Sequence, residues 1–179
     1  SYEYVFDIVK IAKKNGLKNI LVTNGFINKE PFEKISGFID AMNIDLKSFS
    51  EKTYLRFCNA KIAPVLEIIK TAYKKRIHIE ITTLIIPEVN DSSEELEKIA
   101  KFIASIDKNT EQKANVFSSV SPSLKPKKDL QRLGDIPWHI SRFFPHYKIQ
   151  NKEITSKETL ERAYKIGKRY LNYVYMRNI

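Results

Sequence analysis

Short apolar runs alternate with amphipathic stretches along most of the 179 residues. In the first amphipathic stretch, Val5, Ile8, Val9 and Ala12 recur at the i, i+3, i+4 and i+7 spacing of one helix face. The apolar runs are short and bounded by turn residues, which is typical of buried strands. The pattern predicts strands over residues 19–23, 38–45, 77–86, 137–144 and 173–176. It predicts helices over residues 4–15, 28–35, 51–58 and 62–75. Two further helices are expected, one that begins after Ser92 and one that begins after Thr155 and ends at about residue 170.

Strands that alternate with helices indicate an α/β fold with a parallel sheet. In such folds the functional groups gather where the strands end, at their carboxyl ends. Two helix starts fit the capping-box pattern, with Ser92 and Glu95 at one and Thr155 and Glu158 at the other. We expect one domain over residues 1–179. Residues 107–135 break its rhythm and are expected to be an insertion or a mobile loop.

The composition is that of an ordinary globular protein, with 42% hydrophobic and 29% charged residues. No apolar run approaches the roughly 20 residues that span a bilayer, so we expect no membrane partner. The net charge of +10 would suit a nucleic-acid binder. However, lysine supplies 24 of the 31 basic residues and is scattered over nearly every helix, which argues against nucleic acid and for a solvated surface.

Cys58 is the single cysteine of the chain. One cysteine rules out an internal disulfide and any multi-cysteine metal or cluster site built from this chain alone, so we expect no metal ligands here. A reducing, cytoplasmic setting is the default for such a sequence. Within its helical segment, Cys58 is expected to be a core thiol.

The stretch 41–49 carries the most unusual pattern, because Asn43, Asp45 and Lys47 follow one another two residues apart in an apolar run. On a strand, side chains at this spacing point to the same face. Opposite charges on a buried strand are costly unless they are paired or bind a ligand. The stretch is therefore a candidate site. The alternative is that Asp45 and Lys47 lie just past the strand end, in solvent.

Five motifs follow one another in order and at sensible spacing. They are residues 17–25 (LKNILVTNG), 39–47 (IDAMNIDLK), 79–87 (IEITTLIIP) with 90–92 (NDS), 137–143 (PWHISRF) and 173–178 (YVYMRN). Together they resemble the radical SAM enzymes of the AmmeMemoRadiSam system, a family that is similar in turn to the pyruvate formate-lyase activating enzymes. The resemblance covers nearly the whole chain except residues 107–135.

The resemblance implies a partial (β/α)6 barrel that binds S-adenosylmethionine and a [4Fe-4S] cluster and generates a 5′-deoxyadenosyl radical for hydrogen abstraction. It also implies an electron donor such as flavodoxin or ferredoxin, and a substrate that the residues do not identify, a protein being one candidate. The family's Cys-x3-Cys-x2-Cys loop and its Gly-Gly-Glu segment are absent from this sequence. We therefore expect the cluster ligands upstream of Ser1, both chain ends to be cut from a longer protein, and the free chain to be inactive.

The resemblance also implies cofactor contacts, although no catalytic residue can be assigned. Asp45 and Lys47 match the family's Asp-Leu-Lys and would contact the amino-acid end or the ribose of the cofactor. Asn24 ends a strand that lines the pocket, and Thr82 occupies a pocket-facing position on a later strand. Tyr147 stands where relatives carry the histidine of Pro-x-His, so the role of that position is open.

Two other function classes fit some of the same residues. Lys47 at a barrel strand end could be the Schiff-base nucleophile of an aldolase-like enzyme, although the adjacent Asp45 works against the lowered pKa that this needs. A non-catalytic, basic RNA-binding module is the second alternative, and it would bind with a steep salt dependence.

Overall fold

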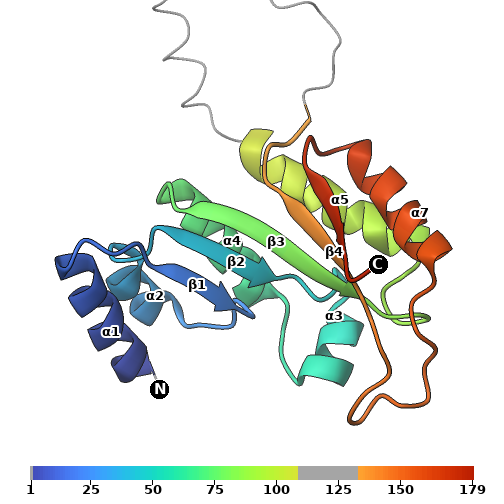
Figure 1. Cartoon of the computed structure of the whole chain (residues 1–179), viewed down its shortest axis with the longest axis horizontal. Coiled ribbons are helices and arrows are strands. Elements are labelled where there is room, and N and C mark those ends of the chain that lie inside the picture. Colours follow the sequence, from blue (N-terminus) through green and yellow to red (C-terminus); the bar gives the residue numbers. More distant parts are fainter. Residues whose placement is uncertain (1, 109–132) are drawn as a thin grey trace, which may run out of the picture.

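The computed structural model describes residues 2–108 and 133–179 of the chain (Figure 1). In this part, five strands form one sheet in the order β1-β2-β3-β4-β5, and every neighbouring pair is parallel. The predicted α/β fold with a parallel sheet is thereby confirmed. Most of the insertion predicted over residues 107–135 lies outside the described residues.

All five predicted strands are present, each within a few residues of its expected ends. The strands are β1 (Ile20–Thr23), β2 (Ala41–Asp45), β3 (His78–Ile85), β4 (Trp138–Arg142) and β5 (Val174–Arg177). The helices are α1 (Tyr2–Lys14), α2 (Lys29–Ser36), α3 (Glu51–Thr53) with a π-helical turn (Tyr54–Cys58), α4 (Ala63–Lys74), α5 (Ser93–Lys108) and α7 (Lys157–Lys168). Among the described helices, none combines the length and apolarity needed to cross a membrane.

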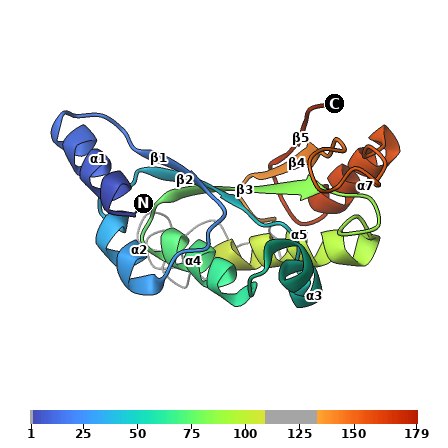
Figure 2. The same ribbon diagram turned by 90° about the horizontal axis from the view of Figure 1, so that it is seen from below.

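The two faces of the sheet differ in what covers them. Figure 2 shows α2, α4 and α5 along one face, and no described helix lies over the other, which we call the open face. Strand β3 alternates accordingly, with Ile79, Ile81, Thr83 and Ile85 buried and the residues between them partly exposed. Trp138, on β4, is fully buried. The core therefore lies between the sheet and its helices, and polar groups collect on the open face.

The capping boxes are only half right. Ser92 accepts a hydrogen bond from the Glu95 N–H, at 3.2 Å, as predicted. The Glu95 carboxylate, however, turns away from Ser92 and accepts hydrogen bonds from the Ser48 hydroxyl and the Phe49 N–H. Tertiary partners beyond β2 outcompete the local one, and Glu95 ties α5 to the segment that follows Asp45.

The second capping box, Thr155 with Glu158, is wrong by one residue. Ser156 is the N-cap of α7 and accepts from the Thr159 N–H at 3.1 Å. Thr155 is fully buried, donating to the Ile85 carbonyl and accepting from the Phe143 N–H. Its hydroxyl is thus used to join the ends of β3 and β4.

Candidate functional site

One row of side chains crosses the open face over four strands. The parallel register places Asp45 opposite Thr82, Thr82 opposite His139, and His139 opposite Tyr175. Trp138 and Ile140, on either side of His139, are buried in the core, so His139 points to the open face. The row brings the predicted residues Asp45 and Thr82 together. It adds His139 and Tyr175, which sequence reasoning had not assigned to the site.

Asp45 and Lys47 form an ion pair at the carboxyl end of β2, with 2.6 Å between Nζ and Oδ2. Their side chains are 33% and 41% exposed. The predicted common face is confirmed, and the pairing removes the cost of placing opposite charges there. Because both groups remain accessible, a ligand with two charges of opposite sign can reach them.

The backbone after Asp45 is held although the strand has ended. Leu46 donates to the Thr82 carbonyl at 2.9 Å and accepts from the Thr83 hydroxyl at 2.9 Å. The Lys47 N–H donates to the phenol oxygen of Tyr54 at 3.2 Å. Burial raises the pKa of Tyr54 to about 12, so this phenol stays neutral. The alternative of a strand end in solvent is right in part, because Lys47 lies past the end of β2 and both side chains are partly exposed. The backbone there is nevertheless ordered by its neighbours.

The other predicted contacts lie in different surroundings. Thr82 faces the open side and donates to the Asn43 side-chain oxygen at 2.8 Å. Asn24 is exposed and accepts from the Phe26 N–H at 3.0 Å, which shapes the turn after β1. Tyr147 is 75% exposed, with φ of 53° and Lys148 over its ring. Within the described residues, no hydrogen bond or ion pair joins Asn24 or Tyr147 to the Asp45–Lys47 pair.

Glu80 is the centre of a second polar group on the open face. Its carboxylate bonds His139 Nε2 at 2.8 Å and His78 Nε2 at 3.4 Å. The two histidines are thus the partners of Glu80 on this face. Arg177 donates through Nε to His139 Nδ1 at 3.3 Å, and the His139 ring stacks on Tyr175.

The hydrogen bonds of His139 determine its tautomer. A guanidinium can only donate, so Nδ1 of His139 must accept from Arg177. The proton is then on Nε2, which donates to Glu80. A neutral imidazole satisfies both partners, and its orientation is fixed from two sides. The arrangement could have been suspected from Glu80 and His139 only with the strand register in hand.

Cys58 does not lie in the core, contrary to expectation. It is exposed at the end of the π-helical turn after β2. Partial burial of the sulfur raises its pKa, and the charge of Lys47 acts in the opposite direction. Among the described residues, no group of three or more His, Cys, Asp or Glu side chains is arranged to hold a metal ion.

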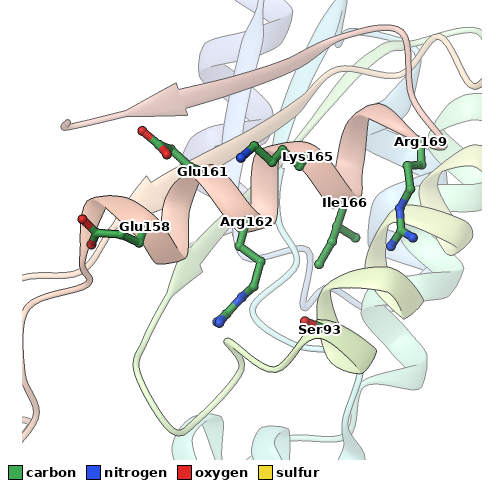
Figure 3. A pocket seen from close by; sticks show the side chains of 7 residues that line it. All are labelled: Ser93, Glu158, Glu161, Arg162, Lys165, Ile166 and Arg169. Carbon is green, nitrogen blue, oxygen red and sulfur yellow. The ribbon is translucent and has the colours of Figure 1, made fainter.

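A surface groove lies elsewhere, between α7 and the start of α5 (Figure 3). Arg162 and Ile166 point from α7 toward Ser93, while Glu158 and Glu161 point away from it. Arg162 already donates to the Asp91 carbonyl at 2.8 Å. The groove belongs to the helical layer, and the row of Asp45, Thr82 and His139 lies on the opposite, open face. The two are separate features.

The family model of the Radical SAM superfamily matches residues 1–103, which include β1 to β3 and the Asp45–Lys47 pair. The chain belongs to the radical SAM superfamily. The match of the family model covers more than half of the sequence. The superfamily contains the family expected from the five motifs.

Two curated relatives and one solved structure extend this result. The chain is 36% identical to an uncharacterized protein of Methanocaldococcus jannaschii over 99% of its own length and 45% of the relative. It is 24% identical to the pyruvate formate-lyase 1-activating enzyme of Escherichia coli K12, over 94% of this chain and 63% of the enzyme. The chain thus spans about half to two thirds of these relatives.

The structural comparison supports the fold. A domain of the pyruvate-formate lyase-activating enzyme from Bacteroides vulgatus superposes with a TM-score of 0.71 at 18% identity, covering 98% of this chain and 90% of that domain. The predicted similarity to radical SAM enzymes of the activating-enzyme kind, and the partial barrel with a parallel sheet, are confirmed. The single cysteine does not fit a [4Fe-4S] cluster, which needs at least three thiolates from its protein.

Proposed function

We propose that the chain forms the S-adenosylmethionine-binding wall of a radical SAM enzyme, with Asp45 and Lys47 as its main contacts. Superfamily membership supports the cofactor, and the position of the pair at the carboxyl end of β2 supports the place. The cysteines for the cluster would then lie outside these 179 residues. The proposed reaction class for the whole protein is hydrogen abstraction by a radical derived from the cofactor.

The accessible Asp45–Lys47 pair is the observation that carries this proposal. The amino-acid end of S-adenosylmethionine holds an ammonium and a carboxylate. Lys47 would pair with the carboxylate, and Asp45 with the ammonium or with the ribose hydroxyls. A ligand with both charges replaces the internal ion pair without leaving either side chain unpaired, so binding avoids the cost of an isolated charge.

The remaining predicted contacts have unequal support. Thr82 lies opposite Asp45 in the register, so it is well placed to touch the same ligand. Asn24 and Tyr147 lie in the segments that follow β1 and β4 at the carboxyl ends of the strands. We propose all three as outer contacts of the cofactor. The aldolase-like alternative is less suited, because Lys47 Nζ is engaged by Asp45 rather than free to attack a carbonyl.

We further propose a protein substrate, an electron donor such as flavodoxin or ferredoxin, and a cytoplasmic location. The protein substrate follows from the name of the Escherichia coli relative, which is an activating enzyme of another enzyme. The electron donor follows from the need of radical SAM chemistry for a reductant. A single cysteine that cannot form an internal disulfide suits a reducing compartment.

Calorimetric titration with S-adenosylmethionine tests the site. We expect Asp45→Ala and Lys47→Ala each to weaken binding by roughly 1.5–3 kcal/mol, the usual value of a charged hydrogen bond. Asp40→Ala is the matched control, because Asp40 directly precedes β2 at its other end and pairs with Lys13 at 2.7 Å. Unchanged affinity in the Asp45 and Lys47 variants, or an equal loss in the Asp40 variant, would contradict the proposed site.

A further inference from the structure

The carbonyl of Lys47 lies beyond the end of β2 and accepts a hydrogen bond from a side chain. The last hydrogen bond of the β2–β3 pair in this direction is from the Leu46 N–H to the Thr82 carbonyl. One residue later, the Lys47 carbonyl accepts instead from a side chain, Nδ2 of Asn90, at 2.6 Å. The residue that carries the proposed cofactor contact is therefore tied to the rest of the fold through Asn90.

The amide of Asn90 uses both of its donor hydrogens and its oxygen. Nδ2 also donates to the Leu84 carbonyl at 2.8 Å, and Oδ1 accepts from the Ile86 N–H at 2.7 Å. The residue is only 2% exposed. Reversing the amide would place its oxygen against two carbonyl oxygens, so the orientation is unique.

The Asn90 amide joins two segments beside the candidate site, the one after β2 and the one at the end of β3. Leu84 and Ile86 belong to the end of β3 and the segment after it, and Lys47 to the segment after β2. A buried side chain with three hydrogen bonds costs free energy if any is lost, because water cannot replace it. The spacing between the ends of β2 and β3 is thus set by one side chain that itself does not reach the open face.

We propose that Asn90 is a positioning residue of the site, which locks the Lys47 backbone to the end of β3 and so keeps the Asp45–Lys47 pair in the geometry that binds S-adenosylmethionine. The positioning role rests on the proposed function. The lock itself rests only on the hydrogen bonds and burial of Asn90.

The chain contains a matched control for this proposal. Asn19 is 9% exposed, and its Nδ2 donates to the carbonyls of Val9 and Phe38, both at 2.9 Å. It directly precedes β1, at the amino ends of the strands. Asn19 and Asn90 therefore make the same kind of hydrogen bonds at opposite ends of the strands. Exchange of either amide for a carboxylate removes two donors of a buried group.

The experiment compares Asn90→Asp with Asn19→Asp in the full chain, by amide hydrogen exchange and by calorimetric titration with S-adenosylmethionine. We expect both variants to be less stable. Only Asn90→Asp should speed exchange at the Lys47 amide and weaken cofactor binding, by about tenfold or more, equivalent to about 1.4 kcal/mol. Asn19→Asp should stay within about twofold of the wild type in affinity.

Equal effects of the two variants on the Lys47 amide or on the affinity would overturn the proposal. If Asn90→Asp does not fold, Asn90→Ala replaces it, since alanine removes the donors without adding a charge. A wild-type chain that does not bind S-adenosylmethionine would remove the proposed function and with it the positioning role. Exchange at Lys47 would then still decide whether the lock exists.

Discussion

Glu80 shows how a single residue on the open face gains its electrostatic character from distant partners. Burial raises the pKa of this carboxyl, but the hydrogen bonds from His78 and His139 lower it, and the net shift is downward from the ordinary 4.5. A lowered pKa means that the ionised form is stabilised by the folded state. Glu80 therefore links the stability of the sheet to pH.

The sign of this linkage gives a prediction. Because the folded-state pKa lies below the unfolded one, the contribution of Glu80 is fully present above about pH 4.5. It is lost as the pH falls through the folded-state value. We expect the free energy of unfolding of the wild type to fall more steeply below pH 4.5 than that of Glu80→Gln. Urea unfolding at several pH values measures both curves, and parallel curves would contradict the role of Glu80.

Gly25 occupies a position at which the tertiary structure requires a glycine. It has φ of +70°, a conformation that strains other residues. A Cβ at this position would also lie 2.9 Å from Ile44 Cγ2 and 3.1 Å from Val65 Cγ1. We expect Gly25→Ala to destabilise the protein by about 1–3 kcal/mol in denaturant unfolding. Gly16→Ala, with a positive φ but open space around it, should cost less.

At the scale of elements, two adjacent residues at the start of α7 have different roles. Ser156 caps the helix at the surface, whereas the buried Thr155 hydroxyl joins Ile85 and Phe143. The two residues are adjacent in the sequence, but the loss of each hydroxyl has a different free-energy cost. A surface cap can be replaced in part by water, and a buried hydroxyl cannot.

The two residues give a paired prediction. Ser156→Ala should lower the free energy of unfolding by about 1 kcal/mol, the usual cost of losing an N-cap. Thr155→Val keeps the shape but leaves a buried carbonyl and a buried N–H unpaired, so we expect about 1–3 kcal/mol. Thermal and denaturant unfolding of the two variants would test the order. A larger loss for Ser156→Ala than for Thr155→Val would contradict the role assigned to the buried Thr155 hydroxyl.

At the scale of the whole molecule, the one-sided sheet divides apolar residues into two populations. Ile81, on β3, is fully buried under the helices, whereas Val22, on the edge strand β1, is 76% exposed. Both are β-branched strand residues with the same apparent role in the sequence. Their energetic weights differ, because only burial away from water stabilises the fold.

This difference can be measured directly. Ile81→Ala should cost about 2–5 kcal/mol, through lost burial and a residual cavity. Val22→Ala should change the free energy of unfolding by no more than about 0.5 kcal/mol. Equilibrium unfolding in urea gives both values under the same conditions. A large loss for Val22→Ala would show that the open face is covered in solution.

The fold was predictable from the sequence to within a few residues at most strand ends, because apolar periodicity is a local property of the chain. The arrangement of the candidate residues was predictable in part. Asp45 and Lys47 lie on one face, as their spacing in a short motif predicts, and the register brings Thr82 beside Asp45. His139 was not assigned to the site, and Cys58 was expected to be a core thiol. Neither position could be judged without knowing what lies beside it.

The sequence by itself determined the order of strands and helices, the parallel α/β class and the common face of Asp45 and Lys47, since backbone period and turn residues encode all three. Only the tertiary structure decided that His139 meets Glu80, 59 positions away, and that Asn90 holds the Lys47 carbonyl from 43 positions away. Such contacts depend on strand register and on the packing of loops. These are properties of the assembled sheet, and no local pattern contains them.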